Sequence, residues 1–236
     1  MSDGCLAQRA YLYLLERILK GEFAIGQVIS RRKIAADLGM SFLPTSEAFL
    51  RLQCDGLLES RPRAGTRIRI PSRQDVQGYF VVREALEVKA AMMFAERSTS
   101  GERAELIRLA SRVDAHARRQ SSDPVSYIAL HADMHLKIAE YTGCSALIEA
   151  IRKQSALASA WRGAMKAYVP QVAPPIHGPL MKALARQKPP EAGETMRAHL
   201  HSEMEQIMLS LEPWFESNKK HTQTYSRSGR REPAAA

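Results

Sequence analysis

The sequence has few cysteines and no long apolar run, and these two absences narrow the class of protein. Its three cysteines, Cys5, Cys54 and Cys144, lie far apart among 236 residues, so neither a disulfide framework nor a Cys-x-x-Cys metal site is available. No segment approaches the roughly 18 consecutive apolar residues that a membrane span needs, and the N-terminus lacks a basic-then-apolar secretion signal. We therefore expect a cytoplasmic protein with free thiols and no membrane partner.

The composition is that of a folded, basic protein. Hydrophobic residues make up 45% and charged residues 25% of the chain, which is ordinary for a globular protein, and the length allows two domains that each bury a core. A formal charge of +9 favours a polyanionic partner such as nucleic acid. Part of this excess lies in residues 216–236, which lack apolar periodicity and which we expect to form a disordered basic tail.

The N-terminal part has the pattern of a winged helix-turn-helix. Apolar residues recur at helical spacing from Leu6 to Leu19, and two more helices are predicted over Arg31–Leu38 and from Ser41 to Cys54, with Gly39 between them. Two short helices joined by a tight turn are typical of a helix-turn-helix. The following LLES and TRIRI segments alternate in polarity and predict the two strands of a wing.

A long helical region follows. From Ser72, a candidate helix cap, the periodicity is helical throughout, so we place the domain boundary at Pro71-Ser72 and expect domains over residues 1–71 and 72–215. The predicted spans are Asp75–Arg97, Gly101–Gln120, Pro124–Thr142, Ser145–Lys166, Pro175–Arg186 and Pro190–Leu211. The predicted fold is therefore mainly α: three helices and a two-stranded wing, followed by an all-α bundle.

The segment from Ile18 to Ile68 carries an ordered set of small, apolar and polar residues. Its members are Gly21, Gly26, Ile34-Ala35, Leu38-Gly39, Ser41, Pro44, Glu47-Ala48, Leu52, Gly56-Leu57 and Gly65. In this order they resemble the winged helix of the GntR superfamily of transcriptional regulators. The resemblance implies a homodimer that binds double-stranded operator DNA, because a winged helix reads one half-site and two-fold operators match two-fold proteins.

Several residues of this segment are candidates for DNA contact. Hydroxyls near a helix N-terminus suit phosphate, arginines reach backbone or groove edges, and a glycine lets the wing approach closely. The candidates are Arg32, Ser41, Phe42, Thr45, Ser46, Arg63, Gly65 and Arg67. The family usually has arginines where this chain has Phe42 and Ser46, which implies an unusual operator, a lower affinity, or an apolar contact between Phe42 and a thymine methyl group.

Three later segments, VQGYFVVREALEVKAAMMFAE, HADMHLKIAEYTG and HGPLMKALARQKPPEAGETMRAHL, resemble the FCD ligand-binding domain of the FadR-type branch of that superfamily. Many FCD domains bind a divalent metal through an aspartate and three histidines. Carried over position by position, this resemblance implies His135, His177 and His199 as ligands and places His131 where the aspartate would be. His131 and His135 share a helix face, whereas Asp133 and His201 should point away.

The predicted donor set and its charge suggest which metal and which effector bind. Four neutral imidazoles favour zinc or nickel over magnesium or calcium, which prefer oxygen. Without an acidic ligand the site would be more positive, so we expect a small organic acid as effector. Arg83 is the residue we assign to its carboxylate, through a charge-assisted pair.

These observations predict a ligand-responsive DNA-binding transcriptional regulator and not an enzyme. One alternative is a metal-dependent hydrolase, although the sequence has no His-Glu-x-x-His string and four histidines would close a tetrahedral site. A second is a regulator that has lost operator binding, suggested by Phe42 and Ser46. A third is an apolar pocket that binds an acyl-type ligand without metal.

Overall fold

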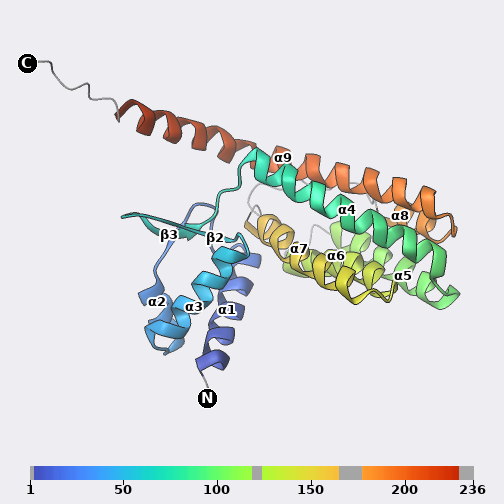
Figure 1. Ribbon diagram of the computed structural model, residues 1–236, viewed down its shortest axis with the longest axis horizontal. Coiled ribbons are helices and arrows are strands. Elements are labelled where there is room, and N and C mark those ends of the chain that lie inside the picture. The colour runs from blue at the N-terminus through green and yellow to red at the C-terminus, as the bar shows by residue number, and fades with distance from the viewer. Residues whose placement is uncertain (1–2, 119–123, 165–176, 229–236) are drawn as a thin grey trace, which may run out of the picture.

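The computed structural model describes residues 3–118, 124–164 and 177–228, and these form a small N-terminal lobe and an elongated helical lobe (Figure 1). The N-terminal lobe contains α1 (Asp3–Leu19), β1 (Val28–Ile29), α2 (Arg31–Leu38), α3 (Phe42–Cys54), β2 (Leu58–Arg61) and β3 (Gly65–Ile68). This is the predicted winged helix-turn-helix. The prediction that α2 ends at Gly39 is confirmed, because this glycine has a φ of 59°, in the left-handed region that favours glycine.

The wing has three strands, where the sequence predicted two. The strand order is β1-β3-β2, and both pairs are antiparallel. In the outer hairpin Leu58 pairs with Ile68 and Arg61 pairs with Gly65. Strand β1 was missed because two residues are too few to show an alternating pattern. Its added pairing ties the start of α2 to the wing and so restrains the surface that α2, α3 and the wing share.

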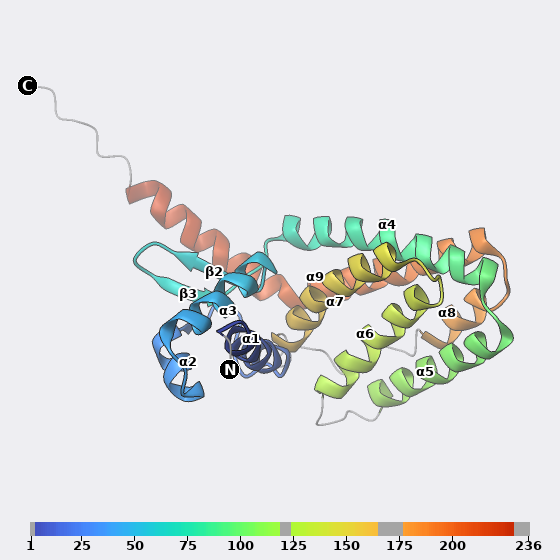
Figure 2. The same cartoon turned by 60° about the horizontal axis from the view of Figure 1, so that its bottom comes forward.

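The second lobe is the predicted all-helical bundle. Its helices are α4 (Arg73–Arg97), α5 (Ser100–Arg118), α6 (Pro124–Glu140), α7 (Ser145–Ala164), α8 (His177–Leu184) and α9 (Pro189–Ser228). Helices α4 and α9 run side by side, with α5, α6 and α7 on one side of the pair (Figures 1 and 2). No described helix combines the length and the apolar character that crossing a membrane requires.

Local signals explain where α4 begins. The predicted cap at Ser72 is confirmed: its hydroxyl accepts from Asp75 N, and the Asp75 side chain accepts from Ser72 N at 2.8 Å. This capping box satisfies two backbone donors that the first turn would otherwise leave without a partner. Helix α4 therefore starts directly after the wing, without a long flexible linker.

Helix α9 extends further than the sequence suggested. The expected tail began at residue 216, whereas α9 continues to Ser228, and residues 229–236 lie outside the described part of the chain. The extension contains no glycine or proline between Phe215 and Ser228, so nothing in it stops a helix that is already nucleated by its packed N-terminal half. Lack of an apolar stripe predicts lack of packing, but it does not by itself end a helix.

Two apolar cores underlie the two lobes. In the N-terminal lobe, residues such as Leu14, Phe49 and Leu52 are fully buried. In the helical lobe, Phe94, Leu106 and Met134 are among the largest buried side chains. The helical core also surrounds a group of buried polar residues, which form the candidate site described below.

Candidate functional site

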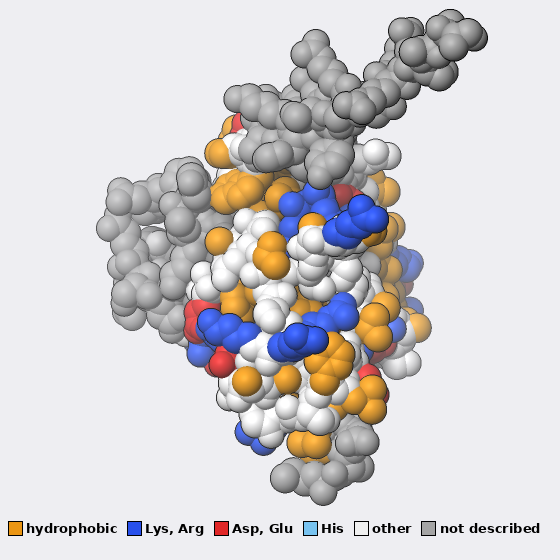
Figure 3. Space-filling model, turned by 90° about the vertical axis from the view of Figure 1, so that its left-hand side faces the viewer, with side chains coloured by type: hydrophobic (Ala, Val, Ile, Leu, Met, Phe, Trp, Pro, Cys, Tyr) orange, Lys and Arg blue, Asp and Glu red, His pale blue; other side chains and the backbone are white. Residues whose placement is uncertain are grey.

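The exposed start of α3 and the neighbouring face of α2 form a candidate DNA-binding surface. Phe42, the first residue of α3, is 53% exposed, an unusual position for a large apolar side chain. It lines a surface depression of about 450 Å³ together with Arg32 and Met40. Viewed from the side of the N-terminal lobe, this end of the molecule carries scattered lysine and arginine side chains beside exposed apolar ones (Figure 3).

The structure distributes the eight predicted DNA-contact residues unevenly. Those with exposed side chains or backbone are Arg32, Ser41, Phe42, Arg63 and Gly65, whereas Ser46 and Arg67 are partly buried. Thr45 is completely buried, and its hydroxyl donates to Ser41 O at 3.2 Å. This bond satisfies the hydroxyl within the first turn of α3. The Thr45 side chain therefore supports the helix from inside the lobe and does not face the surface.

Two wing arginines are placed by specific local features. Arg63 occupies the tip of the hairpin with a φ of 61°, a left-handed conformation that few non-glycine residues adopt. Arg67 donates through Nε to Glu59 on the neighbouring strand. Arg63 is thus presented to solvent, while Arg67 is already paired within the sheet.

Arg31 contributes to this lobe in a way that sequence reasoning missed. Its guanidinium lies 5.4 Å from the centre of the Phe49 ring and donates to Ser60 Oγ at 3.4 Å and to Thr66 Oγ1 at 3.3 Å. These contacts connect α2 to α3 and to both strands of the hairpin. Arg31 is therefore a structural residue, whereas its neighbour Arg32 is exposed.

Four histidines converge in the interior of the helical lobe. His131 and His135 lie on α6, His177 begins α8, and His199 lies on α9; each is at most 7% exposed. The ring centres of His131 and His177 are 4.9 Å apart, and those of His135 and His199 are 5.2 Å apart. The four predicted metal-binding side chains are thus brought together.

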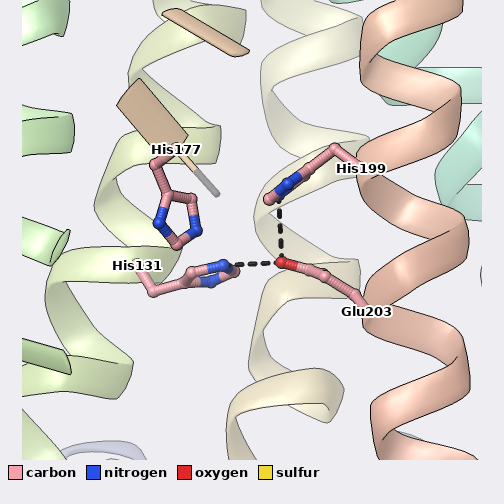
Figure 4. Close-up of side chains that lie close together, drawn as sticks. All are labelled: His131, His177, His199 and Glu203. Carbon is pink, nitrogen blue, oxygen red and sulfur yellow. Dashed lines mark ion pairs between the residues drawn. The ribbon is translucent and has the colours of Figure 1, made fainter. Parts of the chain in front are cut away.

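The cluster contains a carboxylate that the sequence analysis did not include. Glu203 lies one turn after His199 on α9 and is 2% exposed. Its Oε1 lies 2.6 Å from His131 Nε2 and 3.2 Å from His199 Nε2 (Figure 4). Donor atoms of His131, His177, His199 and Glu203 all lie within 4.8 Å of one another. The same i,i+4 spacing that joins the two α6 histidines was a signal that could have revealed Glu203.

Two further carboxylates fix the orientation of the histidine rings. His177 Nδ1 donates to Asp114 Oδ1 at 2.7 Å, and His135 Nδ1 donates to Glu87 Oε2 at 2.5 Å. Gly178 N also donates to Asp114, at 3.1 Å, which holds that carboxylate at the start of α8. In each neutral ring the proton is then on Nδ1, so the lone pair is on Nε2. This carboxylate–histidine arrangement is typical of metal sites.

Arg83 is already engaged within the protein. Its Nε donates to Glu87 Oε1 at 2.5 Å, and its Nη1 donates to Glu203 Oε2 at 2.7 Å. The Arg83 side chain is 4% exposed. The residue that sequence analysis assigned to an effector carboxylate therefore holds two internal carboxylates, one from α4 and one from α9.

The environment shifts the pKa values of the buried groups in different directions. Burial, aided by the nearby His199, lowers the pKa of His177 to about 4. Burial likewise lowers the pKa of His199. For His135, burial acts to lower the pKa, but Glu87 and Glu203 outweigh it and raise the value. Burial would raise the pKa of Glu87, but Arg83 and His135 lower it to about 2.

The donor atoms of the cluster fit a divalent transition metal. His177 Nε2 is buried and makes no hydrogen bond to any described residue. A buried acceptor without a partner is costly, and a cation in the middle of the cluster would satisfy it. Imidazole nitrogens with a carboxylate oxygen suit zinc or nickel.

Asp133 and His201, which were expected to point away from the metal ligands, are both exposed.

Comparison with known proteins identifies the two lobes. Residues 6–68 match the gntR family of bacterial regulatory proteins, and residues 79–202 match the FCD domain. The HTH-type transcriptional repressor RspR of Escherichia coli (strain K12) is 24% identical over 214 residues, which cover 88% of this chain and 92% of RspR. Both lobes are therefore shared with a transcriptional regulator.

A second curated relative matches only in part. The protein of Paenarthrobacter nicotinovorans named "Probable D-xylose utilization operon transcriptional repressor" is 37% identical over 83 residues, which are 35% of this chain and 37% of that protein. The match to an HTH-type regulator of Agrobacterium vitis spans 50% of that relative. These partial matches cover too little of either relative to transfer its specificity.

Solved structures share the fold. Escherichia coli McbR/YncC superimposes with a TM-score of 0.68 at 19% identity, covering 89% of this chain and 98% of that one. A GntR regulator from Rhodococcus sp. RHA1 also gives a TM-score of 0.68, at 23% identity, covering 86% and 97% of the two chains. At these identities the comparison shows the fold alone.

Proposed function

This chain belongs to the GntR family of bacterial transcriptional regulators that carry an FCD domain, and from this premise we propose that it is a metal-dependent sensor of a small organic acid. It is a DNA-binding regulator whose C-terminal domain binds a ligand. Proteins with these two domains act as regulators and not, in general, as enzymes.

The metal proposal rests on one observation: buried imidazoles from three helices meet around a common centre. The proposed ligands are His131, His135, His177 and His199, and the proposed metal is zinc or nickel. Two of these rings have Nδ1 held by carboxylates, so their lone pairs are directed inward before any metal arrives. When bound, a divalent cation would supply a Lewis-acidic centre to which an anionic ligand can bind.

The proposed effector is a small organic acid that reaches this centre through a carboxylate oxygen. Arg83 is bonded to two carboxylates that are buried with it, so an acid that took over one of these contacts would displace an internal partner. Glu203 is the partner that also contacts the histidines. Binding of an acid that displaced Glu203 would be coupled to a change in the position of Glu203 and of α9.

The DNA-binding proposal uses the exposed residues of the N-terminal lobe. Arg32, Ser41 and Phe42 would meet one half-site of double-stranded operator DNA, and Arg63 and Gly65 of the wing would lie along the backbone. A homodimer in the cytoplasm would present two such surfaces. An effector that binds one arrangement of the two lobes more tightly would then shift the population between DNA-binding and free states.

Metal analysis after purification without chelator tests the proposal. We expect about one zinc or nickel ion per chain in the wild type, and loss of that ion when the four buried histidines are changed to alanine together. His201→Ala is the matched control, because this histidine lies on the same helix as His199 but is exposed. A wild type that carries no metal and takes up neither zinc nor nickel would rule out the metal-dependent sensor.

Gel shifts test the DNA-binding part separately. The DNA upstream of the protein's own gene, at low salt, should be bound by the wild type in a metal- and acid-dependent manner. Sedimentation analysis of the same preparation should give a dimer. Absence of binding to any upstream fragment at low salt would instead support a regulator that has lost its operator.

A further inference from the structure

We propose that Glu203 is itself a ligand of the metal, so that this site combines imidazole nitrogens with an internal carboxylate oxygen. The inference deepens the proposed function and rests on it, because it concerns the same buried centre. It replaces the all-imidazole ligand set that the sequence suggested with a mixed nitrogen and oxygen set.

The position of Glu203 Oε1 supports this assignment. It lies 2.6 Å from His131 Nε2, 3.2 Å from His199 Nε2 and 3.6 Å from His135 Nε2. In the group of described side chains whose donor atoms all lie within 4.8 Å of one another, Glu203 supplies the carboxylate and three histidines supply the nitrogens. Figure 4 shows Glu203 reaching from α9 toward His131 while His177 faces the same space from the opposite side.

The other oxygen of Glu203 is held in place by Arg83. The bond from Arg83 Nη1 to Oε2 measures 2.7 Å, and both side chains are almost fully buried. Because Arg83 holds one oxygen, the other is directed toward the histidines. The carboxylate is therefore oriented before a metal binds, as ligating carboxylates in metal sites generally are.

A second, independent feature indicates a cation at this centre. His177 Nε2 is buried without a hydrogen-bond partner among the described residues, and its ring is fixed with that atom toward the cluster because Nδ1 is bonded to Asp114. Hydrogen bonds between Glu203 and the other imidazoles do not satisfy it. One divalent cation would satisfy His177 and Glu203 together, since their donor atoms lie within 4.8 Å.

The charge of the surroundings is also suited to a divalent cation. Among the described residues, the charged side chains bonded to this cluster are three carboxylates, Glu87, Asp114 and Glu203, and one guanidinium, Arg83. With neutral imidazoles, three negative charges and one positive charge leave a formal charge of −2. A divalent cation brings this buried group to neutrality, which lowers the cost of keeping unbalanced charge away from water.

Zinc binding by matched glutamine variants tests the role of Glu203. Glu203→Gln keeps the size of the side chain and an acceptor for Arg83 but removes the charge. Glu205→Gln is the control, because Glu205 has the same i,i+4 relation to a histidine, His201, on the exposed face of α9. Affinities for zinc are measured by competition with a chromophoric chelator, and the visible spectrum of bound Co²⁺ reports the ligand set.

We expect Glu203→Gln to bind zinc at least about 10-fold more weakly than the wild type and to change the Co²⁺ spectrum, while Glu205→Gln changes neither. Equal affinity and an unchanged Co²⁺ spectrum in Glu203→Gln would overturn the assignment and leave the histidine site standing. A wild type that binds neither ion would overturn the proposed metal sensor and this inference together.

A second variant guards against a folding defect. If Glu203→Gln does not give the wild-type circular dichroism spectrum in chelator, Glu203→Asp replaces it, since the charge is kept but the oxygen is drawn back toward α9. The aspartate variant should bind zinc more weakly and shift the Co²⁺ bands. A wild-type affinity and spectrum in the aspartate variant would count against coordination by Glu203.

Discussion

Replacement of Arg83 by methionine removes the only guanidinium bonded to Glu87 and Glu203 among the described residues. Methionine has a similar unbranched stem, so it fills most of the space but carries neither charge nor hydrogen-bond donors. Both carboxylates are at most 4% exposed. The substitution therefore removes the guanidinium that both buried carboxylates bind.

The magnitude follows from that burial. Removing one partner of a buried ion pair costs about 3–5 kcal/mol. Because Arg83 serves two buried carboxylates, we expect the metal-free protein to lose about 5 kcal/mol. For a chain of this size that corresponds to a melting temperature lower by about 10–20 °C. With zinc bound beside Glu203, part of the lost positive charge is replaced and the difference should shrink.

Thermal unfolding followed by circular dichroism, in excess chelator and in saturating zinc, measures both effects. Arg197→Met is the matched control. Arg197 also pairs with two carboxylates, those of Glu84 and Glu194, but on the surface, where ion pairs contribute little. If Arg83→Met melts no lower than Arg197→Met in chelator, the buried network does not stabilise the fold as argued.

Three further outcomes are expected. Phe42→Arg should strengthen binding to operator DNA and steepen the dependence of log K on log salt by about 0.9, measured by fluorescence anisotropy over a salt series; an unchanged slope would show that Phe42 lies away from phosphate. Asp114→Asn should weaken zinc binding about 10- to 100-fold in chelator competition, because the acceptor that orients His177 loses its charge; wild-type affinity would contradict this. Unfolded His177 takes up a proton below pH ~6.5, whereas the pKa of folded His177 is about 4. The free energy of unfolding should therefore decrease as the pH is lowered from ~6.5 towards the folded pKa. Between pH 6.5 and 5, metal-free wild type should lose about 1.5 kcal/mol more than His177→Gln in denaturant titrations, because the slope approaches about 1.4 kcal/mol per pH unit only below the unfolded pKa; equal losses would refute the lowered pKa of His177.

Much of the fold could be predicted because its signals are local. The bounds of α2 follow from the cap at Ser30 and from Gly39, and the start of α4 follows from the capping box at Ser72. Such signals depend only on residues within one turn. Strand β1 has no comparable local signal, because its two residues form a strand only by pairing with β3, which is distant in the sequence.

The candidate DNA-binding surface does not include the side chain of Thr45. Thr45 was expected at the surface because it is polar and near the start of a helix. Its side chain instead faces the core, and its hydroxyl is satisfied by Ser41 O. A threonine that bonds the backbone one turn earlier can be buried at little cost, so polarity alone does not tell which face of α3 meets solvent.

The candidate metal site was predictable in part. The i,i+4 spacing of His131 and His135 places both on one face of α6 from the sequence alone. The contacts that orient the cluster join distant segments: Asp114 and His177 are 63 residues apart, and Arg83 and Glu203 are 120 apart. No periodicity reports such pairs, so the sequence supplied the four histidines but none of the carboxylates that orient them.

The buried carboxylates change the charge that an effector would meet at this centre. Four imidazoles and a divalent cation alone would make a positive site that attracts an organic acid by excess charge. Among the described residues, the charges of Glu87, Asp114 and Glu203 are balanced by Arg83 and the proposed divalent cation, so the metal-loaded centre would carry no net positive charge. We therefore expect an acid to bind by exchange, taking over the proposed contact of Glu203 with the metal and its contact with Arg83. Glu203 is part of α9, which packs along α4, and α4 begins directly after the wing. We therefore expect that exchange to move the helix pair that leads to the N-terminal lobe.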